Sequence, residues 1–165
     1  MIMKFSPLLF ALCLFPVHSW SAQPGDPAPE CSLPLLTDDS QTMSLNQFKG
    51  KVVFLDFWAS WCPPCEKSFP FLDQLHEKYH SKGLEVITVN LDEEKQDALS
   101  FIERLPVEFT IVHDSEGTCP ELYQVQAMPS SYLIDKSGKI KYVNYGFLSS
   151  EEEALTNQVT SLLNE

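Results

Sequence analysis

Positive charge is scarce in this sequence. Its 165 residues include 11 lysines and arginines against 23 aspartates and glutamates, which gives a formal net charge of −12. A chain this acidic repels nucleic acids and anionic membrane surfaces, so neither is expected as a partner. We interpret the acidity as a source of solubility, with no specific ligand implied.

Long apolar runs are missing as well. The apolar stretch at residues 5–17 is shorter than the roughly 20 residues that a membrane-spanning helix needs. It follows Lys4 and precedes small residues up to Ala22, which is the layout of a secretory signal peptide. We therefore expect a cleaved signal peptide over residues 1–22 and one mature domain over residues 23–165. An uncleaved N-terminal anchor is the alternative.

The sequence also lacks a second pair of closely spaced cysteines. Cys62 and Cys65 are separated by two residues, whereas Cys31 and Cys119 stand alone. Cys13 belongs to the predicted signal peptide, which leaves four cysteines in the mature domain. Zinc ribbons need two close pairs, which disfavours a metal site made of these four. In the oxidising compartment that export implies, Cys31 and Cys119 could pair with each other. The sequence leaves two alternatives to this bond open, namely two buried free thiols or an intermolecular disulfide.

A literal zinc-protease pattern is present but poorly supported. Residues 76–80 read H-E-K-Y-H, and two histidines four apart on a helix can share a metal. No third ligand is evident, however, and the motif falls in the last turn of a predicted helix, close to Gly83. We therefore interpret His76 and His80 as part of a solvated helix face and expect no metal site.

What the sequence does contain is an alternation of buried strands and amphipathic helices. Three runs are apolar or β-branched enough for buried strands, at residues 52–58, 84–92 and 108–114. Two short strands are expected before them, within residues 31–50. The remaining predicted elements are helices at 63–82, 93–105 and 149–163, a short helix or turn at 116–125 and a hairpin at 130–146. This order predicts an α/β fold whose sheet has a parallel core and an antiparallel edge, with helices on both faces.

The Cys62–Cys65 pair lies where the first buried strand ends and the first long helix begins. Pro63 suits the first helical position, because the N–H that proline lacks would be unpaired there. The free N–H groups and the dipole of the helix favour the thiolate of a cysteine at this point. We expect Cys62, at the exposed tip, to be the nucleophile and Cys65 to be the resolving thiol. A purely structural disulfide here would close a two-residue loop and constrain almost nothing, so the pair is predicted to be redox-active.

The residues around this pair resemble a known family. Residues 56–65, D-F-W-A-S-W-C-P-P-C, resemble the active site of thioredoxins. Residues 50–79 are similar to the TlpA/ResA branch of the thioredoxin-like superfamily, and the similarity extends over roughly residues 28–163. It implies a thioredoxin fold, which is a central mixed β-sheet flanked by helices, here with an N-terminal β-hairpin extension and an inserted helix.

The resemblance also implies roles for residues outside the pair. Pro129 is expected to be a cis-proline beside the disulfide, so that the Met128 backbone can pair with a bound cysteine segment of the substrate. Trp61, Pro63 and Pro64 are expected to shape the surface on which that substrate docks.

Asp56 is the single charged residue in its predicted strand. A buried carboxyl is costly unless it is paired or kept neutral, and thioredoxins carry an Asp at the matching position that passes protons to the resolving cysteine. The resemblance therefore implies that Asp56 accepts a proton from Cys65. A structural Asp bonded to backbone or water is the alternative. Thr88 stands where thioredoxins place a lysine beside this Asp.

Two positions depart from the TlpA/ResA branch. Glu66 replaces the basic residue that usually follows the second cysteine, and its negative charge disfavours the thiolate. Ser68 replaces a glutamate that is linked in relatives with cytochrome c maturation, which weakens the case for that pathway.

Together these features imply an exported, periplasmic thiol-disulfide oxidoreductase. The resemblance favours a monomer without a cofactor that reduces disulfides of protein substrates and is recharged by a membrane thiol donor. An oxidant or isomerase could use the same residues, because only the potential differs. A non-catalytic docking module is a further alternative. A peroxidase is disfavoured by comparison, because peroxidase sites use an arginine and the only arginine, Arg104, lies far along the chain.

Overall fold

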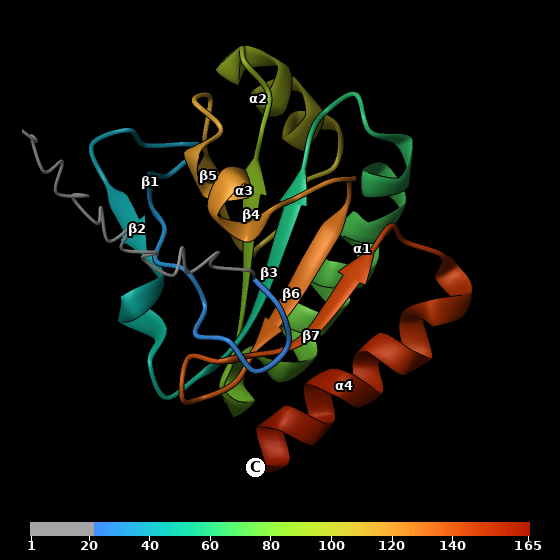
Figure 1. Cartoon of the computed structure of the whole chain (residues 1–165). Coiled ribbons are helices and arrows are strands. Elements are labelled where there is room, and N and C mark those ends of the chain that lie inside the picture. The colour runs from blue at the N-terminus through green and yellow to red at the C-terminus, as the bar shows by residue number, and fades with distance from the viewer. Residues whose placement is uncertain (1–21) are drawn as a thin grey trace, which may run out of the picture.

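A five-stranded sheet forms the centre of the protein, in the order β5-β4-β3-β6-β7 (Figure 1). The computed structural model describes residues 22–165. The strands are β3 (Val52–Trp58), β4 (Leu84–Asn90), β5 (Thr110–His113), β6 (Ser130–Ile134) and β7 (Ile140–Tyr145). β3, β4 and β5 run parallel, whereas β6 and β7 are antiparallel to their neighbours. The predicted parallel core with an antiparallel edge is therefore confirmed.

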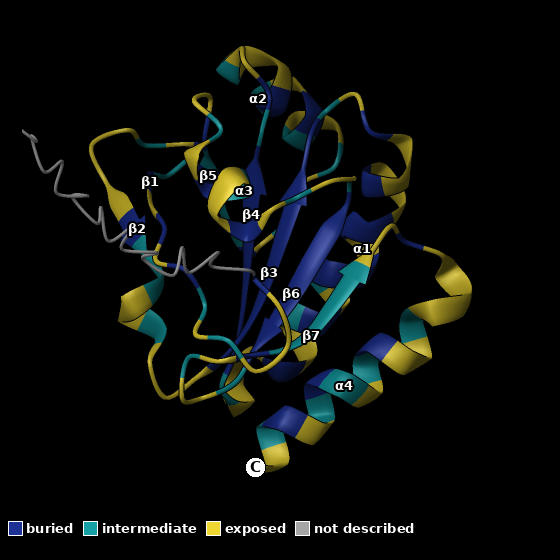
Figure 2. Ribbon diagram, viewed as in Figure 1, coloured by how far each residue is buried: buried dark blue, intermediate teal, exposed yellow. Residues whose placement is uncertain are grey.

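The amino-acid composition of β3 and β4 explains why they occupy the middle of the sheet. Every residue of both strands is buried, as the dark blue arrows in Figure 2 show. Consecutive apolar residues suit a strand covered on both faces, since successive side chains point to opposite sides. The two strands pair in parallel register, with Leu55 opposite Ile87.

Three helices cover one face of the sheet. They are α1 (Pro63–Tyr79), α2 (Lys95–Arg104) and α4 (Glu152–Asn164). Their buried residues form one apolar cluster with side chains of β3 that include Phe54 and Trp58. We call this side of the sheet the α1 face.

The opposite face is covered by smaller elements. These are the hairpin of β1 (Ser32–Pro34) and β2 (Thr42–Ser44), the 3-10 helix η1 (Leu45–Phe48) and the short helix α3 (Thr118–Tyr123). Buried residues from the hairpin and from α3 share a second cluster with Phe57 of β3. The predicted N-terminal hairpin and the presence of helices on both faces are confirmed.

Several helix boundaries differ from the prediction. The inserted helix, predicted over residues 93–105, is Lys95–Arg104, and the last helix is preceded by a 3-10 turn, η3 (Ser149–Glu151). The first long helix changes at its end to a second 3-10 turn, η2 (His80–Lys82), because terminal turns commonly tighten in this way. Gly83 then ends it with a φ of 100°, a left-handed conformation that glycine adopts without steric cost.

The first described residues are attached to the far edge of the sheet. The Gly25 N–H donates to the Ile140 carbonyl at 2.7 Å, and the Ile140 N–H donates to the Asp26 carbonyl at 2.9 Å. The signal peptide predicted over residues 1–22 lies outside the described residues except for its last position. Within residues 22–165, no helix combines the length and the apolar character needed to cross a membrane.

Candidate redox site

Cys62 and Cys65 form a disulfide just beyond the end of β3, where α1 begins. Their Cα atoms are 5.3 Å apart. Cys62 is the N-cap of α1, and its Sγ accepts a hydrogen bond from the Cys65 N–H at 3.3 Å. Cys65 is fully buried, whereas Cys62 is 4% exposed and is the more accessible residue of the two. The exposed tip of the loop is Trp61, at 68%, and not Cys62 as predicted, because Cys62 caps the first turn of α1.

A groove of about 440 Å³ opens beside Cys62. No charged side chain lines it, and its lining residues are Trp61, Cys62, Pro63, Pro64, Leu91, Pro120, Val125, Gln126, Ala127 and Met128. We call residues 61–64 the α1 wall, and Pro120 together with residues 125–128 the α3 wall. Of the predicted docking residues, Trp61, Pro63, Pro64 and Met128 line this groove, whereas Pro129 follows it in the chain without lining it. The groove suits an uncharged segment placed against Cys62.

The peptide bond between Met128 and Pro129 is cis. It directly precedes β6, which pairs with β3, and the Pro129 carbonyl accepts a hydrogen bond from the Gly146 N–H at 2.7 Å. The backbone after the bond is thus anchored in the sheet, while Met128 lines the same groove as Cys62. The pairing of Met128 with a substrate stays a prediction.

Asp56 is an isolated carboxyl in the middle of β3. It is 2% exposed, and its Oδ2 has no hydrogen-bond partner among residues 22–165. Burial raises the pKa of this carboxyl well above its usual range. Because side chains alternate along a strand, Asp56 points to the same face as Phe54 and Trp58, whose cluster includes both cysteines of the redox pair. Asp56 is therefore a buried carboxyl with a raised pKa on the face that carries the disulfide.

Thr88 lies opposite Asp56 in the register of β3 and β4. Its Oγ1 accepts a hydrogen bond from Nε1 of Trp58 at 3.1 Å. The position at which thioredoxins supply a lysine is thus occupied by a hydroxyl that is already engaged. It provides no countercharge for Asp56, which is consistent with the raised pKa of that carboxyl.

Asp92 is a site residue that the sequence analysis did not identify. Its carboxylate accepts hydrogen bonds from the Ser60 N–H and the Ser60 hydroxyl, both at 3.0 Å, and from the Asn90 amide at 2.8 Å. Its carbonyl oxygen pairs with Nε2 of His113 at 2.8 Å. Asp92 therefore fastens the loop before Cys62 to the ends of β4 and β5. A signal was available, because polar residues that follow neighbouring parallel strands meet at one edge of the sheet.

A second disulfide joins Cys31 to Cys119, with Cα atoms 5.8 Å apart and a sequence separation of 88. Of the three outcomes that the sequence left open, the structure has the intramolecular bond. Both cysteines are at most 4% exposed and belong to the cluster opposite the α1 face. The bond ties the residue before β1 to the start of α3.

The H-E-K-Y-H motif shows no sign of a metal centre in the described part of the chain. Among residues 22–165, no group of three His, Cys, Asp or Glu side chains is arranged to hold a metal. The rings of His76 and His80 stack with centroids 4.7 Å apart, and His80 Nδ1 lies 3.6 Å from the Glu85 carboxylate. His76 is partly buried, and its Nδ1 is shielded from solvent. His80 is thus exposed as predicted, whereas His76 is less solvated than predicted.

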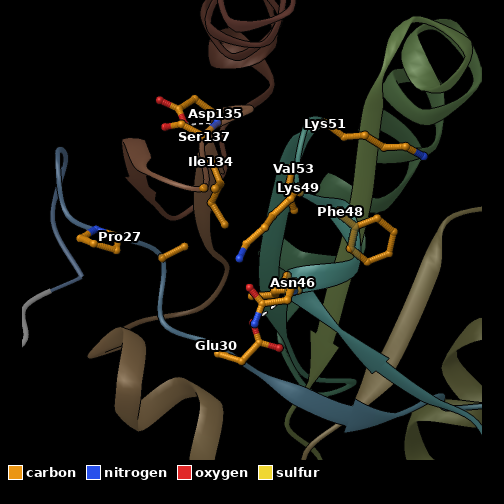
Figure 3. Close-up of a pocket in the computed structure, with 13 residues that line it drawn as sticks. Pro27, Glu30, Asn46, Phe48, Lys49, Lys51, Val53, Ile134, Asp135 and Ser137 are labelled. Atoms are coloured by element: carbon orange, nitrogen blue, oxygen red, sulfur yellow. Dashed lines mark hydrogen bonds between the residues drawn. The ribbon is translucent and has the colours of Figure 1, made fainter.

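A second cavity, of about 260 Å³, lies at the other end of β3 (Figure 3). It is lined by the N-terminal segment, by η1 and by the turn between β6 and β7. Lys49 extends into it, whereas Lys51 points away. Glu30, on its rim, accepts a hydrogen bond from the Asn46 N–H at 3.1 Å. No cysteine lines this cavity, so the groove beside Cys62 is the stronger candidate for chemistry.

Comparison with known proteins agrees with this geometry. Residues 23–159 match the Redoxin family, a stretch that includes every residue of the groove. The thiol-disulfide oxidoreductase ResA of Oceanobacillus iheyensis is 35% identical over 127 residues, which are 76% of this chain and 66% of that protein. The ResA protein of Geobacillus thermodenitrificans is 36% identical over 128 residues, 78% and 72% of the two chains. The matches thus span about two thirds of the length of these relatives.

Solved structures share the fold. A Chlorobium tepidum protein, assigned as the thiol:disulfide interchange protein DsbE, is 44% identical with a TM-score of 0.82, covering 86% of this chain and 98% of that chain. StoA of Bacillus subtilis is 27% identical with a TM-score of 0.67, covering 84% and 98%. The thioredoxin-like fold expected from the sequence is therefore confirmed.

Proposed function

The chain belongs to the Redoxin family as a thioredoxin-like protein of the TlpA/ResA type, and from this we propose that it is a thiol-disulfide oxidoreductase that reduces disulfides of exported proteins. One observation carries the proposal. The Cys62–Cys65 disulfide caps α1, and Cys62 opens on an uncharged groove. The names of the ResA relatives support the same class of reaction.

The reaction begins with the reduced pair. The Cys62 thiolate attacks one sulfur of a substrate disulfide, the other substrate sulfur leaves as a thiolate that takes up a proton, and a mixed disulfide joins Cys62 to the substrate. Cys65 then attacks the Cys62 sulfur and releases the substrate as its second thiol. Two electrons have passed to the substrate, and the Cys62–Cys65 disulfide of the structure is the resulting state of the protein.

The start of α1 prepares Cys62 for the first step. The Cys65 N–H that reaches Sγ, and the positive end of the helix dipole, both stabilise a negative charge on that sulfur. Glu66 lies in the same first turn and opposes them. We therefore expect the thiolate of Cys62 to be less favoured than it would be beside a basic residue.

Asp56 is the candidate proton acceptor for the second step. Cys65 must lose a proton before it attacks, and a carboxylate whose pKa is raised by burial is a stronger base than an exposed one. In this proposal Asp56 holds the proton after the disulfide has formed. The raised pKa of Asp56 in the oxidised structure is consistent with that state.

Export, and a donor at the membrane, complete the proposal. The signal-peptide layout of residues 1–22 and the buried Cys31–Cys119 disulfide both support a periplasmic location, because disulfides persist outside the reducing cytoplasm. Renewed reduction of Cys62–Cys65 needs two electrons, which we assign to a membrane thiol donor. Docking would place the substrate cysteine between the two walls, against Met128 and Pro129.

The midpoint potential of Cys62–Cys65 tests this function directly. The protein is equilibrated in graded thiol/disulfide buffers, and alkylation of each cysteine is mapped by mass spectrometry, so that Cys31 and Cys119 are followed separately. A midpoint near or below about −230 mV supports a reductant, since thioredoxin lies at about −270 mV. A midpoint close to the roughly −120 mV of DsbA favours an oxidant instead. Failure of the pair to titrate would leave a docking module.

A further inference from the structure

The α3 wall of the groove contains no reactive group, yet its helix is anchored at both ends. At the start of α3, the buried Asp114 carboxylate accepts hydrogen bonds from the N–H groups of Gly117 at 3.0 Å, Thr118 at 3.3 Å and Cys119 at 2.7 Å. The Cys31–Cys119 disulfide fixes the same turn to the N-terminal segment. Pro120, the next residue, lines the groove.

The other end of α3 is held by two tyrosine hydroxyls. Tyr123 donates to the Pro29 carbonyl at 2.8 Å, and Tyr132 of β6 donates to the Tyr123 carbonyl at 2.8 Å. Burial raises the pKa of both hydroxyls above the usual range, so both remain donors. The Val125 N–H also donates a hydrogen bond to the Pro120 carbonyl at 2.9 Å, which joins the two parts of the α3 wall to each other.

These hydrogen bonds and the Cys31–Cys119 disulfide determine the position of the α3 wall. A helix of six residues is too short to be stable by itself, so its position depends on tertiary contacts. Cys31 and Pro29, which supply two of those contacts, both come from the N-terminal segment. The anchoring disulfide lies on the face opposite the redox pair and has no part in the proposed electron transfer.

We propose that the α3 wall selects the substrate and that the Cys31–Cys119 disulfide is the positioning element that holds this wall at its distance from Cys62. The proposal rests on the proposed function. The substrate that fits is an extended segment with an apolar side chain next to its cysteine. An acidic neighbour is disfavoured, because the groove offers no cation to a charge that would lose its water there.

The test separates selection from redox chemistry. The exported protein is reduced, and single-turnover oxidation is timed with two synthetic disulfide peptides, which carry leucine or aspartate beside the cysteine. Hydroxyethyl disulfide, which is too small to need the α3 wall, is the third substrate. We expect the wild-type protein to prefer the leucine peptide by at least about tenfold in second-order rate constant. In Cys31→Ala/Cys119→Ala we expect this preference to fall to about twofold, with the hydroxyethyl disulfide rate and the midpoint potential of Cys62–Cys65 unchanged.

Two further variants keep the outcome decisive. Asp114→Asn weakens the hydrogen bonds at the start of α3 but leaves the disulfide in place, and it should also lower the preference. It therefore decides the matter if the double variant fails to fold. Val159→Ala removes buried volume from α4 on the other face, and it should lower stability without changing the preference.

Three results would overturn the inference. One is an unchanged peptide preference when α3 is loosened, and another is an equal loss of preference in Val159→Ala, which would indicate general softening. The third is a preference that changes only together with the midpoint potential, since the disulfide would then act on the redox pair. If the wild-type protein cannot reduce even hydroxyethyl disulfide, it is the proposed function that fails.

Discussion

The two disulfides of this protein have the same covalent chemistry and opposite surroundings. Cys62–Cys65 joins residues three positions apart, at a helix N-terminus beside an open groove. Cys31–Cys119 joins segments 88 positions apart and lies inside the cluster on the other face. A bond that closes a short loop constrains the chain little and can open without loss of the fold, whereas a long-range buried bond stabilises the fold by staying closed.

The largest difference between the two bonds should appear in activity. Cys62→Ser should abolish reduction of hydroxyethyl disulfide, because no other cysteine lines the groove. Cys65→Ser should leave a mixed disulfide with the substrate, which is visible as an added mass. Cys31→Ala/Cys119→Ala should keep its activity toward the same small disulfide. Continued reduction of hydroxyethyl disulfide by Cys62→Ser would contradict this difference between the two disulfides.

For the free energy of unfolding, loss of the Cys31–Cys119 disulfide should matter more than loss of Cys62–Cys65. Loss of the Cys31–Cys119 bond is expected to lower the free energy of unfolding by about 4 kcal/mol, because it frees a long loop in the unfolded chain. Loss of Cys62–Cys65 should cost less than about 2 kcal/mol by the same reasoning. Urea denaturation of Cys31→Ala/Cys119→Ala and Cys62→Ala/Cys65→Ala measures both. Equal losses would contradict the assignment of separate roles.

Two buried aspartates sharpen the comparison further, since each holds the backbone beside one disulfide. Asp92→Asn weakens the contacts to Ser60 and removes a negative charge near Cys62. Both effects favour the reduced pair, so the midpoint potential should become less negative by roughly 15–30 mV, where 30 mV corresponds to about 1.4 kcal/mol. Asp114→Asn, the matched control at α3, should leave the potential unchanged. A shift of the same size in both variants would argue against a specific role for Asp92.

The last expected effect is a pH dependence of stability that comes from Asp56. Its raised pKa means that the folded protein keeps a proton that the unfolded chain loses above the ordinary value of 3.8. The stability that Asp56 contributes is complete below that value and falls by about 1.4 kcal/mol per pH unit as the pH rises toward the folded-state pKa. Asp56→Asn should remove this slope, gain stability at neutral pH and resolve mixed disulfides more slowly.

Denaturation curves of Asp56→Asn and the wild-type protein over a pH series measure that slope. The two proteins should differ least in acid and most at neutral pH. Parallel pH profiles would show that Asp56 ionises normally in the folded state. Because Asn cannot accept the proton, unchanged resolution kinetics would instead remove Asp56 from the proposed mechanism.

Local sequence signals predicted the central sheet and the position of the redox pair. The apolar run of β3, followed directly by a proline-started helix, places Cys62 at a helix N-terminus whatever the rest of the chain does. Helix ends were predicted less well, because 3-10 turns such as η2 depend on contacts beyond the local pattern. Asp92 was missed for a related reason, since its partner Ser60 belongs to another strand–helix junction.

The sequence by itself determined the strands of the central sheet, the family and the cysteine pair at the start of α1, because these follow from patterns along the chain. Only the tertiary structure decided that Cys31 meets Cys119, that Oδ2 of Asp56 has no hydrogen-bond partner among residues 22–165 and that Asp92 holds Ser60. Each of these depends on which distant segments pack together. That choice is made by burial of the whole core, which no short stretch of sequence contains.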